Sequence, residues 1–307
     1  MLVLWLAMME QLTTRGLMVE TAPGVYRDGL EMAQIRRALL GTLRSLFEPV
    51  DASIAVPPVV PLEVVRRAGY VIAFPHLLGL VGGFDGSVRD FATAIAPTAK
   101  APLEPSESPA WAASFDDPLF AMTPAACHGV YDLVPTPVGP SGFKATAVAT
   151  CFRNERSSEL GRFRSFQMFE CVQIGSEPVV AAFIATGRAV VSEFFSALGI
   201  EDEWEAAVDP FFLGDGVASV KTADAPKHEL ATALVPGQPR VAISSVNYHQ
   251  EHFASAFDLS SDAGTTVSAC LGIGIERLTL ALFGRYGLDP ASWPPSVLTA
   301  IGLAAQA

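Results

Sequence analysis

The side chains best suited to binding chemistry gather between Arg153 and Phe166. Arg153 and Glu155 stand two positions apart, so on a strand they would share one face. A guanidinium is a planar fork of donors for phosphate or carboxylate, the carboxylate can accept hydrogen bonds from an amine, and Phe166 offers a flat ring to a base. Any one of these residues alone would fit the solvated surface of a hairpin. Together with Arg162 in the connecting loop, they predict a site for a small polyanion that carries a base.

A second candidate site is the string GIGIER, which runs from Gly272 to Arg277. Glycines at the end of a strand allow another group to approach the backbone closely. Arg277 would then fall in the first turn of a helix, where backbone amides and a guanidinium both favour phosphate. Taken alone, the string fits a glycine turn followed by a surface arginine equally well.

The elements that must position these residues indicate an α+β fold. Alternating apolar and polar residues predict strands over 144–155, 165–175, 241–248 and 265–274, and a Pro-containing β-rich segment over 53–60. Apolar residues at helical spacing predict helices over 28–47, with Asp28 as its N-cap, over about 180–198, and over 275–287. Long antiparallel strands with flanking helices, rather than a βαβ repeat, follow from this order.

The composition is that of a well-packed globular protein, with 50% apolar and 17% charged residues. We expect a single domain over residues 1–307, with a Pro- and Ser-rich loop or insertion at 95–124. The apolar start, MLVLWLAMM, lacks a charged leader and is too short for a membrane span. We therefore expect it to dock on the core of a cytoplasmic protein, with no membrane partner.

Charge and motif content narrow the range of partners. The net charge is −12, from 20 basic and 32 acidic residues, and no dense basic face is evident, which argues against a nucleic-acid backbone as partner. Neither GxGxxG nor GxxxxGK[ST] occurs, so neither of the usual glycine-rich phosphate loops is available. The four cysteines form no CxxC pair.

Taken together, the Arg-Glu hairpin and the GIGIER string resemble the second and third signature motifs of class II aminoacyl-tRNA synthetases. The helix over 28–47 with the PPVV strand is similar to the first motif, which forms the dimer interface in that family. Within the class, the chain is most similar to the archaeal-type zinc-dependent seryl-tRNA synthetases and, closer still, to their shortened bacterial homologues, the amino acid:[carrier protein] ligases. The strings FECVQIG, SSVNYHQEHF and SACLGIGIERL carry this narrower match. The resemblance implies a class II synthetase-like antiparallel sheet flanked by helices, in a homodimer.

The resemblance also implies a zinc ion bound by Cys127, Glu170 and Cys270. Three protein ligands leave a fourth position open, which could take the neutral amino group of a substrate. Ligands so far apart match no local zinc spacing, and two inert buried thiols are the ordinary alternative. Cys151 and Cys171 fall outside the matched pattern, and we expect them to pack in the core.

By the same resemblance, ATP and magnesium activate the amino acid. Arg153 would contact the carboxylate and the α-phosphate, and Arg162 and Arg277 the β- and γ-phosphates, with Arg153 and Arg277 acting catalytically. Glu155 would bind the adenine amino group, and Phe166 would stack on its ring. The substrate pocket would be completed by Lys227, Glu229 and Asn247.

The magnesium ligands depart from the family pattern. Ala242 stands where the seryl enzymes carry an acid that helps to hold this ion. Either Glu155 or Asp258 would then have to supply the carboxylate.

Three histidines near the matched motifs have no firm role. His128 follows Cys127 directly but is not a ligand in the family pattern. His249 and His252 could act in acid–base chemistry. A structural or substrate-positioning role is preferred, because a carboxylate that attacks ATP is already anionic and needs no general base.

These implications predict that the protein activates a small amino acid, glycine or alanine, as its adenylate. The acceptor would be the phosphopantetheine thiol of an acyl or peptidyl carrier protein, which residues 95–124 or the adjoining helices would receive. A tRNA is not expected, because the charge is acidic and little chain precedes the first motif to form a tRNA-reading domain. Two alternatives remain: a seryl-tRNA synthetase-like enzyme that charges tRNA, and a non-catalytic paralogue that senses an amino acid. An assay that compares carrier-protein loading with tRNA charging tests the first alternative. Pyrophosphate exchange tests the second.

Overall fold

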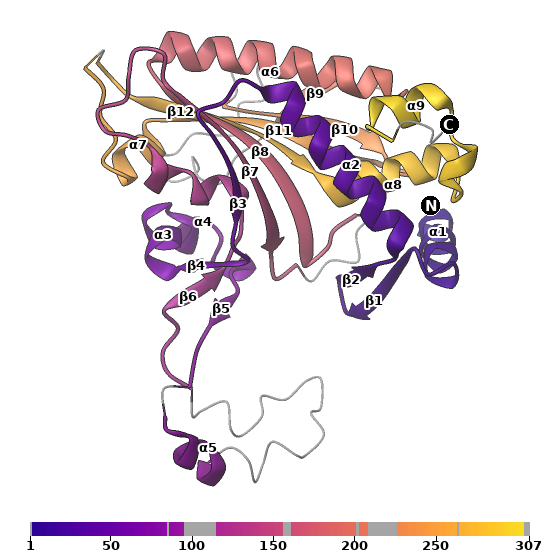
Figure 1. Cartoon of the computed structure of the whole chain (residues 1–307), viewed down its shortest axis with the longest axis horizontal. Coiled ribbons are helices and arrows are strands. Elements are labelled where there is room, and N and C mark those ends of the chain that lie inside the picture. The colour runs from indigo at the N-terminus through magenta and orange to yellow at the C-terminus, as the bar shows by residue number, and fades with distance from the viewer. Residues whose placement is uncertain are drawn as a thin grey trace.

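A seven-stranded sheet forms the centre of the computed structural model, in the order β3-β7-β8-β12-β11-β10-β9 (Figure 1). The structure describes residues 2–84, 86–94, 115–155, 161–200, 203–207, 226–262 and 264–303. The strands are β3 (Ala52–Val56), β7 (Phe143–Phe152), β8 (Ser165–Gly175), β9 (Trp204–Ala207), β10 (Lys227–Ala233), β11 (Arg240–Gln250) and β12 (Val267–Gly274). Only the β3–β7 pair is parallel among these strands. The predicted α+β class with an antiparallel sheet is confirmed.

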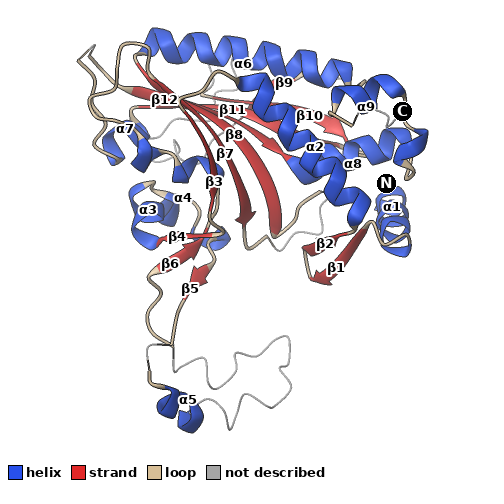
Figure 2. Cartoon of the chain, in the orientation of Figure 1, coloured by secondary structure: helices blue, strands red, loops and turns tan. Residues whose placement is uncertain are grey.

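Three long helices cover one face of this sheet, namely α2 (Leu30–Phe47), α6 (Glu177–Ala197) and α8 (Ile275–Tyr286) (Figure 2). Each presents an apolar stripe at helical spacing, as a helix that packs on one side requires. In α2 the stripe includes the fully buried Met32, Ile35 and Leu39. It meets alternate residues of the central strands, such as Phe169 and Leu271, in one core cluster.

The N-terminal helix α1 (Leu2–Thr14) and the C-terminal α9 (Pro295–Ala300) pack onto the same core. Within the predicted segment, Met8 is buried in this core and Met9 packs against it, in agreement with the expected docking, whereas Leu6 is 55% exposed. Helix α6 is long and apolar enough to cross a membrane, with a mean hydropathy of 1.5. However, its Val180, Val191 and Phe195 are buried in the core cluster, as expected of a core helix.

The opposite face of the sheet is partly covered by short elements. These are α3 (Leu62–Arg67), α4 (Tyr70–Ala73), α7 (His252–Ala256) and the 3-10 turns η1 (Pro75–Leu77), η3 (Ala126–Gly129) and η4 (Tyr131–Leu133). They form a second core cluster with side chains such as Val172 and Ile174 of β8. The uncovered part of this face is free to form a cavity.

The smaller elements lie at the margins of the molecule. The hairpin β1 (Met18–Ala22) and β2 (Val25–Asp28) precedes α2, and η6 (Pro290–Ser292) follows α8. A three-stranded sheet of β4 (Val59–Pro61), β6 (Phe120–Met122) and β5 (Leu80–Val81) extends with α5 (Val88–Ala94) away from the main body (Figure 1).

One local prediction needs correction, and another, the loop or insertion at 95–124, falls only partly on the described residues. Asp28 is not the N-cap of α2: that residue is Gly29, and Asp28 ends β2 with its carboxylate 2.8 Å from the guanidinium of Arg36. A buried guanidinium needs a counter-charge, which explains why this carboxylate turns to the core. The predicted loop over 95–124 contains a strand, β6, at its end, while 95–114 lie outside the described residues.

Candidate active site

Strand register decides which side chains share the open face of the sheet. Glu170 of β8 pairs with Gly272 of β12, and Cys270 of β12 pairs with Asn247 of β11. Since side chains alternate along a strand, Glu170, Cys270 and Asn247 point to the same side. Lys227 pairs with Asn247, which extends this face to β10.

A cavity of about 670 Å³ opens on this face. Every residue that the sequence assigned to ATP, the amino acid or zinc contributes to its lining, a set that spans turn η3, the Arg-Glu hairpin, three further strands and the start of α8. These residues are Arg153, Glu155, Arg162, Phe166, Arg277, Lys227, Glu229, Asn247, Cys127, Glu170 and Cys270. The tertiary structure therefore brings together groups that lie up to 150 positions apart in the chain (Cys127 to Arg277).

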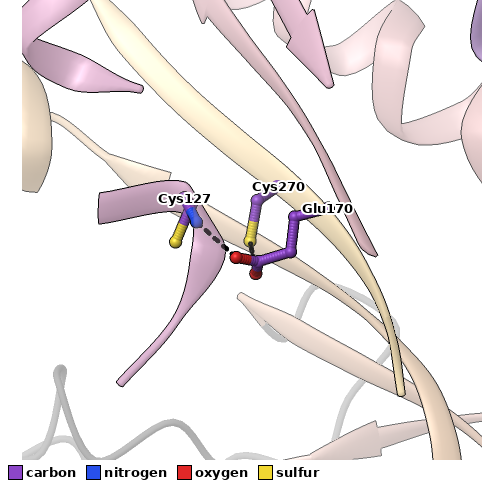
Figure 3. A group of neighbouring side chains, drawn as sticks. All are labelled: Cys127, Glu170 and Cys270. Carbon is purple, nitrogen blue, oxygen red and sulfur yellow. Dashed lines mark hydrogen bonds between the residues drawn. The ribbon is translucent and has the colours of Figure 1, made fainter. Parts of the chain in front are cut away.

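At one end of the cavity lies a buried group of two thiols and a carboxylate (Figure 3). Cys127 comes from turn η3, and Glu170 and Cys270 come from neighbouring strands. Their ligand atoms all lie within 4.8 Å of one another. Glu170 accepts a hydrogen bond from the backbone amide of Cys127, and its Oε1 lies 3.6 Å from Sγ of Cys270.

The charge balance of this group favours a cation. The hydrogen bond with Cys270, together with burial, raises the pKa of Cys127 well above its ordinary value. Burial raises the pKa of Glu170. For Cys270, the hydrogen bond with Cys127 lowers the pKa, but burial and the charge of Glu170 outweigh it. Three acidic groups packed in a dry place can ionise together only beside a positive charge.

Zinc fits this donor set. Thiolate and carboxylate ligands suit the ion, and bond lengths of about 2.3 Å to sulfur and 2.0–2.2 Å to oxygen place the two atoms about 3.5 Å apart in a tetrahedron. The separation between Glu170 and Cys270 agrees with this value. The remaining two cysteines stay outside the group: Cys151 and Cys171 are fully buried in the two core clusters, as predicted.

At the other end of the cavity, three guanidinium groups converge. Arg277 lies in the first turn of α8, where its Nε donates to the carbonyl of Gly161 at 2.8 Å and its Nη1 to that of Ala242 at 2.7 Å. Burial, with the positive charges of Arg162 and Arg153, lowers its pKa to about 10. The group remains cationic at neutral pH, so this end of the cavity is an anion-binding region.

Gly161 is required where it stands. Its φ is +67°, and a Cβ there would come within 2.7 Å of Leu234. Only glycine adopts this conformation without strain, and the carbonyl of this residue helps to fix Arg277.

The Arg-Glu hairpin forms, but its predicted strand is too long: β7 ends at Phe152, so Arg153 and Glu155 lie in the loop after the strand and do not share a strand face. Arg153 follows the last residue of β7, and its amide still pairs with Arg164 across the hairpin at 2.8 Å. Its guanidinium donates to the carbonyl of Pro124 and lies 5.3 Å from the ring centroid of Phe166 on β8. Glu155 accepts a hydrogen bond from Arg162 at 3.4 Å. Cationic and aromatic groups thus share one wall of the cavity.

The opposite wall is made by β10 and β11. Lys227 and Glu229 form an ion pair at 2.8 Å, and both side chains are partly exposed. Asn247 donates to Oγ of Ser245 at 3.3 Å and to Sγ of Cys270 at 3.5 Å. This wall therefore offers a cation, an anion and an amide to a substrate.

Of the two acids considered for magnesium, only Glu155 lines the cavity. Asp258 lies outside it, with a side chain that is 91% exposed and paired with Arg67 at 2.9 Å. The region around Ala242 is occupied by the guanidinium of Arg277.

Sequence reasoning missed a buried ionic network beneath the arginines. Glu276 accepts from Arg36 at 2.9 Å and from the amide of Gln167 at 2.7 Å, while Arg36 also pairs with Asp28. Burial raises the pKa of Glu276 to about 7, against the opposing charge of Arg36. The network joins α2, β8 and α8. Its one visible sign in the sequence is the glutamate next to Arg277 in GIGIER.

The histidines near the metal group are buried and neutral. Burial, followed by the charge of Arg153, lowers the pKa of His128 to about 3. Burial lowers that of His249 to about 3 as well. The ring of His249 lies edge-on to Phe253, with centroids 4.6 Å apart, and Phe253 stacks on Tyr131. This aromatic group closes the cavity behind the metal ligands, and the spacing in SSVNYHQEHF did not predict it.

The chain matches known proteins along most of its length. The family model of the tRNA synthetase class II core domain (G, H, P, S and T) matches residues 114–286. Amino acid–[acyl-carrier-protein] ligase 2 of Bradyrhizobium diazoefficiens is 31% identical over 92% of this chain and 84% of its own length. Type-2 serine–tRNA ligase of Methanopyrus kandleri is 26% identical over 60% of this chain, but over 38% of its own length.

Two solved structures share the fold. A crystal structure of M. kandleri SerRS with A. aeolicus tRNASec superimposes with a TM-score of 0.77 at 22% identity, and covers 95% of this chain. Giardia lamblia prolyl-tRNA synthetase with prolyl-adenylate gives a TM-score of 0.66 at 15% identity. The present chain spans 59% and 54% of these two chains.

Proposed function

Because this chain belongs to the amino acid–[acyl-carrier-protein] ligase family and carries a class II tRNA synthetase core, we propose that it activates a small amino acid with ATP and transfers it to a carrier protein. One observation carries the proposal: a single cavity has three guanidinium groups at one end and a buried Cys-Glu-Cys group at the other. An amino acid has an amino group, which suits a metal, and a carboxylate, which like the polyphosphate of ATP suits the arginines.

In the first step, a carboxylate oxygen of the amino acid attacks the α-phosphorus of ATP. The bond from that phosphorus to the bridging oxygen breaks, and pyrophosphate leaves with the electron pair. The charge of Arg153 acts both on Glu170 and on Arg277, and this residue would neutralise the carboxylate and the α-phosphate. Arg162 and Arg277 would hold the leaving pyrophosphate. Catalysis of this kind rests on positioning and fixed charge.

The base of ATP would occupy the wall formed by the hairpin. Phe166 presents its ring there, and Glu155 can accept a hydrogen bond from the adenine amino group.

Cys127, Glu170 and Cys270 would hold zinc, which supplies an open coordination position for the neutral amino group of the substrate. The space beyond this group is closed by the rings of His249 and Phe253. These rings line the cavity beside the metal group and would limit the size of the substrate side chain. Lys227, Glu229 and Asn247 line the adjacent wall. We therefore propose glycine or alanine as the substrate.

In the second step, the phosphopantetheine sulfur of the carrier protein attacks the carbonyl carbon of the adenylate. AMP leaves with the electron pair, the thiol proton passes to solvent, and a thioester results. The acidic charge of the chain supports a carrier protein over tRNA as acceptor. The exposed face of α2 is the proposed contact of a homodimer.

The decisive experiment is ATP–pyrophosphate exchange across a full panel of amino acids, with zinc measured on the same sample. We expect exchange with glycine or alanine and about one zinc per chain. If no amino acid supports exchange, the proposed enzymatic activity is refuted and a sensing paralogue is favoured.

A second assay decides the acceptor. Radiolabelled amino acid is offered with ATP to a phosphopantetheinylated carrier protein and, separately, to total tRNA. Label on the carrier, released by mild hydroxylamine as expected for a thioester, supports the proposal. Label on tRNA alone would overturn it.

A further inference from the structure

His249 is in direct contact with the proposed metal-binding group, although no motif assigns it a role. Its Nε2 lies 3.5 Å from Sγ of Cys270. Its Nδ1 lies 3.3 Å from the hydroxyl of Tyr131 and 3.2 Å from that of Ser268. The residue is only 5% exposed. Both ring nitrogens therefore have fixed partners of known chemistry.

These partners select one tautomer. A thiolate can only accept a hydrogen bond, so Nε2 must carry the proton if Cys270 is a metal ligand. Nδ1 is then bare and can accept from a hydroxyl, which both Tyr131 and Ser268 can donate. The whole chain of hydrogen bonds runs in one direction, from the hydroxyls through the ring to the sulfur.

A second donor reaches the same sulfur. The side-chain amide of Asn247 donates to Sγ of Cys270, also at 3.5 Å. Cys127 is differently placed, because the partners identified for its thiol are the other two members of the group, Cys270 and Glu170. The two sulfurs thus differ in their surroundings: one receives N–H donors from the protein, and the other does not receive them from the described residues.

We propose that His249 is a positioning residue that orients and stabilises the Cys270 thiolate through an Nε2–H···S hydrogen bond. The inference deepens the proposed function, since it rests on the zinc site. Two thiolates and a carboxylate carry one negative charge more than zinc can neutralise. Donors to one sulfur withdraw part of that excess charge and hold the side chain in the geometry that the ion requires. Residues of this kind typically contribute 10- to 100-fold to metal affinity.

The tautomer can be measured directly by ¹⁵N NMR of the histidine rings in the zinc-loaded protein. Protonated and bare ring nitrogens differ widely in chemical shift. We expect Nε2 of His249 to be protonated and Nδ1 to be bare, with the signals assigned by their loss in His249→Gln. The reverse tautomer, or two protonated nitrogens, would overturn the proposal.

Metal affinity provides an independent test. His249→Phe keeps a ring but removes the donor, and zinc affinity measured by competition with a chelator should fall about 10- to 100-fold. His249→Gln keeps an N–H near Nε2 and should recover most of the loss. In the cobalt-substituted protein, the thiolate-to-cobalt charge-transfer band of His249→Phe should move to longer wavelength, because the donor no longer stabilises the sulfur lone pairs.

A matched control is His252→Gln, because His252 lies in the same motif but its Nε2 faces the carbonyl of Ala68 at 3.0 Å. The zinc affinity of the His252→Gln variant should equal that of the parent protein. If His249→Phe does not fold, Tyr131→Phe combined with Ser268→Ala leaves the ring in place and removes both hydroxyls. The zinc affinity of that double variant should fall by less than about tenfold. An unchanged zinc affinity would contradict the chain of hydrogen bonds.

The outcomes separate this inference from the function on which it rests. Equal losses in the Phe and Gln variants, or none in either, would show that the ring only packs, while zinc and exchange in the parent protein would still stand. A parent protein that retains no zinc would overturn both.

Discussion

The two ends of the cavity hold their charged groups in different ways. The Cys-Glu-Cys end is built from paired strands and one turn, and its three members are almost completely buried. The arginine end is built from a hairpin loop and a helix start, and backbone carbonyls fix its most buried member, Arg277. The pKa values of all three acids at the first end are raised, so they can ionise together only beside a cation, whereas the second end carries its charge at neutral pH. One end is therefore suited to a cation, and the other to an anion.

The largest effect should come from breaking the metal end. Cys127→Ala is expected to lose the zinc and to reduce pyrophosphate exchange to background, because the remaining two ligands cannot hold the ion. The control is Cys151→Ala, a buried cysteine outside the group, which should keep both. Exchange that survives in a metal-free Cys127→Ala would refute the role of the metal.

Removing an arginine at the other end should strongly reduce the reaction with ATP and leave the zinc content unchanged. Arg277→Gln is expected to lower kcat/KM for ATP about 10²- to 10³-fold, since it removes one fixed donor to developing charge. Arg285→Gln, on the exposed side of the same helix, is the control. Steady-state exchange and zinc content are measured together, and a fall in zinc would show that the two ends are not independent.

The ionic network below the arginines should contribute to stability. Arg36→Met leaves the buried carboxylate of Glu276 and the partly buried carboxylate of Asp28 without their counter-charge, so the free energy of unfolding should fall by about 3–5 kcal/mol. Denaturant titration measures the change, with the exposed neighbour Arg37→Met as control. A loss no larger than that of the control would mean that the pair does not stabilise the fold.

The smallest expected effect is a change in pH dependence. The pKa of Glu276 is raised from 4.5 to about 7, so between these values the folded state holds more of its proton than the unfolded state does. Its contribution to the free energy of unfolding should therefore fall as the pH rises from about 4.5 to 7, by roughly 1–3 kcal/mol.

Glu276→Gln should remove this contribution. The quantity to compare is the difference in unfolding free energy between variant and parent at each pH, since His128 and His249 add a slope of opposite sign below about 6.5. A difference that is constant from pH 4.5 to 7 would contradict the raised pKa.

Much of the fold could be predicted because its elements have strong local patterns. The long strands β7, β8, β11 and β12 and the helices α2, α6 and α8 lie close to the ranges expected from periodicity. The error at Asp28 has a long-range cause: its partner Arg36 also binds Glu276, which lies 240 positions after Arg36. No local pattern contains that contact.

The amino-acid sequence by itself determined the chemical groups, the class of fold and the family, through the Arg-Glu hairpin, the GIGIER string and the similarity they carry. Only the tertiary structure decided that Cys127, Glu170 and Cys270 meet within 4.8 Å, and that His249 faces the sulfur of Cys270. The physical reason is strand register. The sequence gives residue types and their local spacing directly. Which face of the sheet a side chain lies on, and which side chain lies beside it, depend on the pairing of strands that are distant in the sequence.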